Sequence, residues 1–356
     1  MPRTSKTRTP AEKVAKPAAL KKTRAKTAGP RRAAQKPVFK TGYVALVGRP
    51  NTGKSTLLNA LLGQKVAIVS DKPQTTRISI LGIKTTAKGQ TVFVDNPGIH
   101  KPLHSMNKRM MNFVYSSLET SDVVCLLLDA TEKFGHGDEF VLETLRKVKT
   151  PVFLLINKVD IVRKDKVLPI IDRYKDLFPF REIIPISALT GINLDVLERL
   201  LTEVLPEAPK LYSDEEISDQ SERFLFAEIV REKILKYVTE ELPFVTAVYI
   251  ETIEKKEQAV RDCPRSGTVP LEVGVMKFGQ TRPVTLVRAL IFVEKDNHRK
   301  IVIGRHGSLI KQVGVEARRE IEEYVGHKVY LELHVKVREH WRDSEDVLDL
   351  IEGQKG

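Results

Sequence analysis

The chain has 356 residues, of which 41% are hydrophobic and 29% are charged, and its formal net charge is +13. The length suits two domains, and the composition is typical of a soluble globular protein. No apolar run approaches the ~20 residues of a membrane-spanning helix, no signal-peptide core is present, and two cysteines, Cys125 and Cys263, make no disulfide framework, so we expect neither an integral membrane protein nor a secreted one.

Most of the positive charge lies at the start of the chain. Residues 1–40 contain thirteen Lys or Arg and one acid, Glu12, which gives this stretch a net charge of +12 and leaves +1 for the other 316 residues. Rich in Lys, Ala and Pro, the stretch is predicted to be a disordered extension. Three interpretations stay open: a solvated extension, an arm that binds nucleic-acid phosphates, and an organellar transit peptide, against which its prolines argue.

From residue 41 to about 205, short apolar strands alternate with helices. A helix is predicted from Ser55 to Leu62, and a hairpin is predicted to turn at Lys88-Gly89. Strands that are apolar on both faces and alternate with helices indicate a mostly parallel sheet covered on both sides, whose ligands lie at the carboxyl ends of the strands. The predicted strands cover residues 43–48, 78–86, 91–98, 123–130, 151–160 and 181–188.

A proline-containing acidic stretch, residues 206–221, is predicted to be a linker to a second body. That body, residues 222–345, begins with an amphipathic helix in which Phe226, Val230, Ile234 and Val238 share one face. Strands are expected at residues 244–254, 286–294 and 328–339, with a loop-rich insertion at 254–283, helices up to Tyr324, and a tail at 346–356.

GRPNTGKS, residues 48–55, matches the phosphate-binding pattern G-x-x-x-x-G-K-[ST] between a strand and a helix. Backbone N–H groups of such a loop bind phosphate oxygens, its lysine reaches the β- and γ-phosphates, and its hydroxyl binds Mg²⁺. The predicted phosphate-binding residues are Gly48, Arg49, Pro50, Asn51, Thr52, Gly53, Lys54, Ser55 and Thr56.

NKVD, residues 157–160, selects guanine over adenine. At the end of a buried strand, the Asp160 carboxylate can accept from both N–H donors on the guanine edge, which adenine lacks. The Lys158 stem is expected along the base plane, and Asn157 is expected to brace the neighbouring loops. We expect the Ala188 backbone N–H to meet the guanine O6. The base site therefore comprises Asn157, Lys158, Val159, Asp160, Ile186, Ser187 and Ala188.

DNPG, residues 95–98, supplies an acid for magnesium and a glycine N–H for the γ-phosphate. In PQTTR, Thr76 is favoured as the magnesium ligand of the GTP state and Thr75 stays open; the metal set is Ser55, Thr76 and Asp95. Such a loop is ordered with GTP and released on hydrolysis.

The predicted catalytic residues are Lys54, Asn51, Thr76 and Gly98, and Asn96 and Pro97 complete the nucleotide loop. Ile99 stands where many GTPases have a water-orienting glutamine, so turnover is expected to be slow without a partner. In related GTPases with an asparagine at the position of Asn51, a monovalent cation replaces a missing positive charge at the phosphates, so we expect activation by K⁺.

VIGRHGSLIK, residues 302–311, contains a G-x-x-G loop that is expected to follow an apolar strand and to open a helix. Glycines let such a loop approach a nucleic-acid backbone closely. The predicted RNA-binding residues are Ile303, Gly304, Arg305, His306, Gly307 and Lys311. Two alternatives stay open: a tight turn with no ligand, and for His306 a solvated loop position.

Together these motifs resemble the Era-type GTPases over residues 41–345, on GRPNTGKSTLLN, PQTTR, DNPG, NKVD, ISA, VIGRHGSLIK, GVEARREIE and LELHVKVREHWR. The resemblance implies an α/β P-loop GTPase domain with a mostly parallel sheet, followed by a smaller α+β type II KH domain. It further implies a monomer that hydrolyses GTP with Mg²⁺ and binds the 3′ end of small-subunit ribosomal RNA. Its role would be assembly of the small ribosomal subunit, in the cytoplasm with weak peripheral association on the inner face of the membrane.

Three features depart from that family: Asn96, the basic extension, and the 254–283 insertion. Two other functions remain open. One is an RNA-binding assembly module that GTP merely stabilises, and the other is binding through the basic extension with an inert G-x-x-G loop. A further hypothesis places the acidic linker, around Asp214 to Glu216, in the RNA groove as a phosphate mimic.

Overall fold

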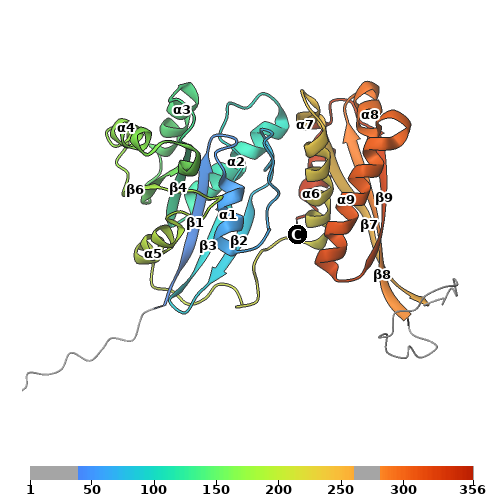
Figure 1. Cartoon of the computed structure of the whole chain (residues 1–356), viewed down its shortest axis with the longest axis horizontal. Helices are drawn as coiled ribbons and strands as arrows, with labels where there is room; N and C mark the ends of the chain where they lie inside the picture. The colour runs from blue at the N-terminus through green and yellow to red at the C-terminus, as the bar shows by residue number, and fades with distance from the viewer. Residues whose placement is uncertain (1–38, 260–280, 356) are drawn as a thin grey trace, which may run out of the picture. The chain divides into compact units, whose positions relative to one another are not determined.

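The computed structural model describes residues 39–259 and 281–355, which belong to one compact unit built on two sheets (Figure 1). The basic extension up to residue 38, Cys263 and the centre of the 254–283 insertion lie outside the described residues. Among the described residues, no helix combines the length and apolar character that crossing a bilayer demands.

The first domain is a six-stranded sheet in the order β2-β3-β1-β4-β5-β6, parallel except for β2. Its strands are β1 Lys40–Gly48, β2 Ile80–Thr85, β3 Gly89–Asp95, β4 Val123–Asp129, β5 Val152–Asn157 and β6 Glu182–Pro185. Its helices are α1 Lys54–Leu62, α2 Ser105–Thr120, α3 His136–Leu145, α4 Lys164–Tyr174 and α5 Leu194–Val204, with a 3₁₀ turn at Val159–Ile161.

Alternation along the buried strands explains the layering. Val44 and Leu46 of β1 pack in one core with α1 and α5, whereas Ala45 and Val47 pack in the other with α2, α3 and α4. The carboxyl ends of β1, β3, β4 and β5 therefore lie along one edge of the sheet, where the predicted motifs begin.

The second domain is a three-stranded sheet, β7-β8-β9, with β7 and β8 antiparallel and β8 and β9 parallel. Helices α6, α8 and α9 bury their apolar faces against one side of this sheet. Its elements are α6 Glu222–Tyr237, α7 Leu242–Val245, β7 Ala247–Ala259, β8 Thr281–Val293, α8 Asp296–Ile303, α9 Ser308–Val325, β9 Lys328–Val337 and α10 Glu345–Glu352, with 3₁₀ turns at Arg305–Gly307 and Trp341–Asp343.

Two expectations about the second domain need revision. The G-x-x-G loop follows a helix, α8, and the prediction of a preceding strand was wrong. Ile301 and Ile303 are typical of a strand by composition, yet the buried residues His298 and Val302 lie four positions apart, the one-sided burial of a short helix. The edges of the insertion are strand rather than loop, since β7 and β8 stay paired as far as Ala259 and Thr281.

The acidic segment 206–221 packs along β2 and β3 of the first domain. Ile83 N donates to Ile217 O (2.8 Å), and Ser218 Oγ donates to Leu81 O (2.8 Å). Asp214 is paired with Lys210, four residues earlier. The groove beside the G-x-x-G loop is lined by residues of α9 and β9 and by none of the acidic segment.

Candidate nucleotide and RNA-binding sites

The phosphate loop joins β1 to α1 and encloses the Lys54 side chain, which is only 6% exposed. Its Nζ donates to Arg49 O (2.8 Å) and Gly48 O (3.4 Å). Burial lowers the pKa of Lys54 to about 8, although the nearby Asp95 carboxylate opposes the shift. The ammonium stays mostly charged at neutral pH, and phosphate oxygens can replace the two carbonyls as its acceptors.

Ser55, Thr76 and Asp95 bring three oxygen-bearing side chains together. Ser55 Oγ donates to Asp95 Oδ2 (2.6 Å), and Thr76 Oγ1 lies 2.9 Å from Ser55 Oγ. Burial raises the pKa of Asp95 to about 6, and its Oδ1 has no hydrogen-bond partner among the residues that the structure describes. A buried carboxylate with a spare oxygen beside two hydroxyls fits Mg²⁺, which prefers oxygen ligands.

The same geometry distinguishes the two threonines of PQTTR. Thr76 Oγ1 lies 3.4 Å from Asp95 Oδ2, whereas Thr75 Oγ1 donates to Lys72 O (2.6 Å) and is turned to its own loop. Position in the structure therefore favours Thr76, as the sequence did.

Gly98 lets the loop after β3 lie against the phosphate loop. A Cβ atom on Gly98 would come within 2.7 Å of Pro50 N, closer than a side chain tolerates.

The next two features of this loop are buried side chains. Ile99 N donates to Gly48 O (2.9 Å), while the Ile99 side chain is buried in the core under α2, α3 and α4. Ile99 thus points away from the nucleotide pocket, and another group must orient the attacking water. Asn96 is fully buried and donates to Leu46 O (3.3 Å) and Val94 O (3.1 Å).

The base-selecting residues follow β5 and β6. Asn157 Nδ2 donates to Thr52 O (2.8 Å) and its Oδ1 accepts from Ala188 N (2.9 Å), so Asn157 ties three loops together. The Ala188 N–H is therefore engaged by Asn157 here, and a guanine O6 would have to share or displace that bond. Asp160 is exposed in the 3₁₀ turn that follows β5.

Asp129, at the end of β4, is a site residue that the sequence analysis missed. Its Oδ2 lies 2.5 Å from Lys158 Nζ, which fixes the lysine that is expected to cover the base. Although burial raises the pKa of Asp129, the Lys158 ammonium and Thr131 outweigh that effect and lower it overall. An acid closing an apolar strand, as in VVCLLLDA, was the available signal.

A pocket of about 470 Å³ brings together the phosphate loop, Thr76, Gly98 and Lys158, whereas Asp95, Asn157, Asp160 and residues 186–188 are not part of its lining. Of the predicted nucleotide residues it is lined by Pro50, Asn51, Gly53, Lys54, Ser55, Thr56, Thr76, Gly98 and Lys158. Arg49 and Thr52 line a neighbouring pocket, where Arg49 pairs with Glu132 (2.8 Å) and Asp138 (3.2 Å). Residues 68–71 also line the nucleotide pocket and were not predicted, because nothing in their composition marks them.

The G-x-x-G loop lies between α8 and α9, with Arg305 and His306 exposed at its tip. Gly304 has φ +77°, and a Cβ there would lie 2.8 Å from Leu309 N, so this position requires glycine. Ile303 is partly buried behind the loop, and Lys311 is exposed in the first turn of α9.

A groove of about 430 Å³ runs from Lys311 between α9 and β9. Its lining adds residues that the sequence analysis missed, among them Arg318 and the half-exposed Tyr330. Lys311 and Arg318 are seven residues apart on α9, and Tyr330 is on the exposed phase of β9, so helical and strand periodicity were the signals that could have found them. A cationic groove with an aromatic ring is suited to single-stranded nucleic acid.

Comparison with known proteins identifies the families of the two domains. Residues 43–158 match the family model of the 50S ribosome-binding GTPases, and residues 275–342 match that of the KH domain. A crystal structure of Era in complex with MgGDPNP and nucleotides 1506–1542 of 16S ribosomal RNA is 38% identical, with a TM-score of 0.79, covering 88% of this chain and 98% of that one. A variant of Aquifex aeolicus Era bound to GDP·AlF₄⁻ is also 38% identical, with the same coverage and a TM-score of 0.76.

The coverage is nearly complete on the relatives' side and extends through both domains. With a phosphate loop, a guanine-selecting strand end and a G-x-x-G groove in that order, the chain belongs to the Era family of GTPases.

Proposed function

We propose that this protein is a GTP-hydrolysing switch that binds the 3′ end of small-subunit ribosomal RNA and acts in assembly of the small ribosomal subunit. The observation that carries the proposal is the match over 98% of an Era whose structure holds MgGDPNP and a 16S ribosomal RNA segment. Its working parts are residues 41–205 for the nucleotide, 206–221 as connection and 222–345 for RNA, with the extension 1–40 and the tail 346–356 outside them.

The nucleotide domain acts by positioning and charge. Lys54 and the backbone N–H groups of residues 48–56 orient the triphosphate, Gly98 N–H meets the γ-phosphate, and Asp160 selects guanine. Ser55, Thr76 and Asp95 would hold Mg²⁺. When bound, Mg²⁺ neutralises charge on the phosphoryl group that is transferred. Because Thr76 belongs to a loop, its engagement depends on the γ-phosphate and supplies the switch.

The RNA site is proposed to be the groove between α9 and β9. The G-x-x-G backbone lies against the RNA backbone, Arg305 and Lys311 pair with phosphates, and exposed bases enter the groove beside Tyr330. Lys311 and Arg318 line one wall, which supports the assignment of a polyanionic ligand.

Potassium activation is a further part of the proposal. Asn51 lines the nucleotide pocket, has φ +63° and donates from Nδ2 to Asp71 O (2.7 Å), so it connects the phosphate loop to the segment before Thr76. A K⁺ ion held there would add a positive charge beside the phosphates. Equal hydrolysis rates in K⁺ and Na⁺ buffers would contradict this part alone.

We also propose that the protein is a monomer located in the cytoplasm, with a fraction held weakly on the inner face of the cell membrane. The support is the net charge of +12 in residues 1–40, which attracts anionic lipid headgroups as well as RNA phosphates. Removal of residues 1–37, which stops short of the folded unit, should abolish sedimentation with anionic vesicles and leave GTP hydrolysis unchanged.

Binding of labelled single-stranded RNA from the small-subunit 3′ end tests the central proposal. Gly307→Asp is the suitable variant, because no atom lies closer than 4.0 Å to its Cβ position, so the added carboxylate repels phosphates without a clash, although φ +75° makes the backbone unfavourable for aspartate. Gly326→Asp is the matched control, with φ +73° and open space at the far end of α9. We expect Gly307→Asp to abolish binding and Gly326→Asp to preserve it.

The nucleotide dependence of the same measurement separates the alternatives. If GDP and a non-hydrolysable GTP analogue give different RNA affinities, the two sites are coupled. If affinity ignores the nucleotide yet depends on Gly307, the protein is an RNA-binding module that GTP stabilises. Binding that survives Gly307→Asp and disappears with residues 1–37 would assign the RNA contact to the extension.

A further inference from the structure

The segment that ends in the switch threonine is held by the second domain as well as by the first. Residues 65–77 connect α1 to β2, and several of them line the nucleotide pocket. Hydrogen bonds from α6, α7 and α9 reach both ends of this segment. The sequence analysis assigned none of these contacts.

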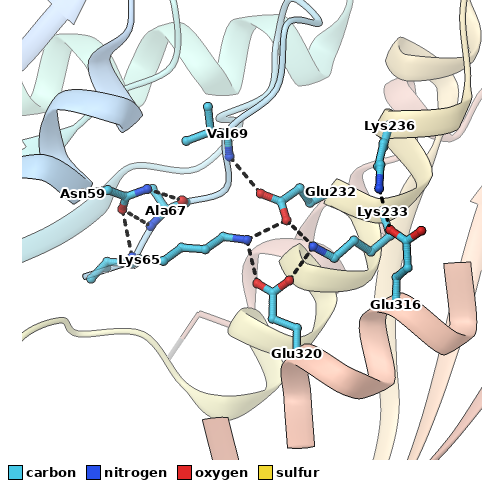
Figure 2. A network of polar contacts seen from close by, with 10 residues as sticks. Asn59, Lys65, Ala67, Val69, Glu232, Lys233, Lys236, Glu316 and Glu320 are labelled. Carbon is cyan, nitrogen blue, oxygen red and sulfur yellow. Dashed lines mark hydrogen bonds and ion pairs between the residues drawn. The ribbon is translucent and has the colours of Figure 1, made fainter. Parts of the chain in front are cut away.

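The first end is shown in Figure 2, where Lys65 points into a cluster of acids from α6 and α9. Lys65 Nζ lies 2.6 Å from both Glu232 and Glu320, and Lys233 contacts the same two acids. Glu232 also accepts from Val69 N (3.2 Å), which fixes the backbone where it enters the nucleotide pocket. On the opposite side, Asn59 of α1 donates to Ala67 O (2.8 Å) and accepts from Ala67 N (2.9 Å), as Figure 2 shows. Asn59 Oδ1 also accepts from Val66 N (2.8 Å).

The second end surrounds Thr76 itself. Arg231 of α6 is 3% exposed; its Nη2 donates to Thr75 O, and Glu228 orients its guanidinium through two further bonds (2.6 and 2.7 Å). On the other side of Thr76, Arg77 donates to Thr246 O (2.8 Å) and Pro243 O (2.8 Å) in and beside α7. Both neighbours of Thr76 are therefore tied to the second domain.

We propose that Arg231, a residue of the RNA-binding domain, is a positioning residue for Thr76 in the GTP state. Thr75 O and Thr76 N belong to one planar peptide group, so the Arg231 bond to that carbonyl fixes the plane from which the Thr76 side chain projects. Thr76 Oγ1 in turn lies 2.9 Å from Ser55 Oγ and 3.4 Å from Asp95 Oδ2. The inference rests on the proposed GTP switch and adds that its metal site is completed by the second domain.

Two buried N–H donors in the contact between residues 75–77 and the second domain make no hydrogen bond. Arg231 Nη1 and Arg77 Nε have no hydrogen-bond partner within the described ranges, 39–259 and 281–355. A buried guanidinium with a spare donor is held less firmly than one whose donors are all paired.

The test compares affinities for a non-hydrolysable GTP analogue and for GDP at fixed Mg²⁺, in the full chain. Arg231→Met removes the bond to Thr75 O while keeping an unbranched apolar stem. We expect analogue affinity to fall about tenfold, as expected for one hydrogen bond from a charged group, with GDP affinity unchanged because GDP does not engage Thr76. Arg231→Lys should restore part of the loss, and the single-turnover hydrolysis rate should fall in parallel.

Arg223→Met is the matched control. Arg223 is on the same helix and also donates to backbone carbonyls, Ile250 O (3.0 Å) and Glu251 O (3.2 Å), but within its own domain. It should leave the ratio of the two affinities unchanged. Glu228→Gln, which weakens the bonds that orient Arg231, should shift the ratio in the same direction as Arg231→Met and carries the test should the latter fail to fold.

Three outcomes would overturn the inference: an unchanged ratio in both Arg231→Met and Glu228→Gln, an equal loss of both ligands, or a shift of the same size in Arg223→Met. Failure of the proposed GTP switch looks different, because the wild-type protein would then not bind the GTP analogue, and failure of the proposed RNA binding leaves these nucleotide affinities unaffected.

Discussion

At the scale of single residues, the proposed choice of guanine depends on the carboxylate of Asp160. Asp160 is exposed in a rigid 3₁₀ turn, because Asn157 and the Lys158–Asp129 ion pair fix the residues just before it. In the proposed site the Asp160 carboxylate accepts from two N–H donors of a guanine edge, and adenine would leave it without partners.

Asp160→Asn should convert base preference. An amide can donate to the 2-oxo group of xanthine, whereas it faces a guanine donor with its own donor. Each lost charge-assisted bond is worth about 1.5–3 kcal/mol, so we expect GDP affinity to fall by at least ~100-fold and xanthosine diphosphate affinity to rise. Equilibrium titration with both nucleotides measures the change.

Asp165→Asn is the control, because Asp165 is an exposed acid at the start of α4 that pairs only with Arg163 in the described structure. Should both variants lose GDP equally, base selection would not depend on Asp160.

At the scale of elements, the segment between the domains is built into the first sheet. The Gln90 side chain of β3 is fully buried; its Oε1 accepts from Leu211 N (2.8 Å) and Tyr212 N (3.0 Å), and its Nε2 donates to Tyr212 O (2.9 Å). The Gln90 amide thus forms hydrogen bonds with three backbone groups of the connecting segment. The acidic, proline-containing sequence of that segment predicted a linker and gave no sign of this contact.

Gln90→Met should release the connecting segment. The variant keeps the volume of the side chain but leaves buried backbone groups unpaired, at about 1–3 kcal/mol each. We expect a loss of about 2–4 kcal/mol in the free energy of unfolding and faster protease cleavage between residues 206 and 221. Gln64→Met, at an exposed position, should change neither quantity.

The helices α6 and α9 contact residues 65–77 through ion pairs, so a fall in pH should weaken that contact. Burial raises the pKa of Glu232, but hydrogen bonds from Lys233 and Lys65 outweigh it and lower the pKa below its ordinary 4.5. A lowered folded-state pKa contributes stability that is present above pH 4.5 and is lost as pH falls through the folded value.

Lys65→Met should therefore flatten the acid limb of the stability curve below pH 4.5 and leave its slope near neutral pH unchanged. Denaturant unfolding at a series of pH values measures this, with Lys255→Met as the exposed control. An acid limb that is identical in wild type and Lys65→Met would contradict the prediction.

On the scale of the whole molecule, apolar contacts join the two domains: Phe224 of α6 packs into the core of the first domain, and a separate cluster surrounds Trp341. Met106 and Met110 of α2 pack with Ala247, Trp341 and Leu348 of the second domain. Trp341 is 1% exposed, and its Nε1 donates to Val245 O (2.8 Å). It is the only tryptophan of the chain, so tryptophan fluorescence reports on the surroundings of Trp341, which also include the Arg77 guanidinium 5.6 Å from the ring centroid.

Met110→Ala should open the cluster and expose Trp341. Truncation of a buried methionine costs about 2–5 kcal/mol, and hydration of the indole should shift its emission to longer wavelength before the secondary structure unfolds. Fluorescence and far-UV circular dichroism, followed through one denaturant titration, would then give separate transitions.

Met111→Ala is the neighbouring control. Met111 is equally buried but packs within the core of the first domain. It should destabilise the protein with coincident transitions and unchanged native emission. Coincident transitions in Met110→Ala as well would show that the domains do not separate on unfolding.

Local patterns in the sequence were sufficient for the nucleotide domain. Strand periodicity, the phosphate loop and NKVD each depend on neighbours within a few residues, so the order of the motifs predicted a mostly parallel sheet with its site at the strand ends. The G-x-x-G loop was also found, although the helix before it was read as a strand because β-branched residues favour strands unless packing overrides them.

The tertiary structure alone decided which residues that lie far apart in the chain come into contact. Arg231 meets Thr75 across 156 positions, Lys158 finds Asp129, and the Ala188 N–H is taken by Asn157. A buried arginine has the same appearance in a sequence as a solvated one. Its partner is set by how two cores pack, and that packing is the sum of many apolar contacts that no local pattern contains.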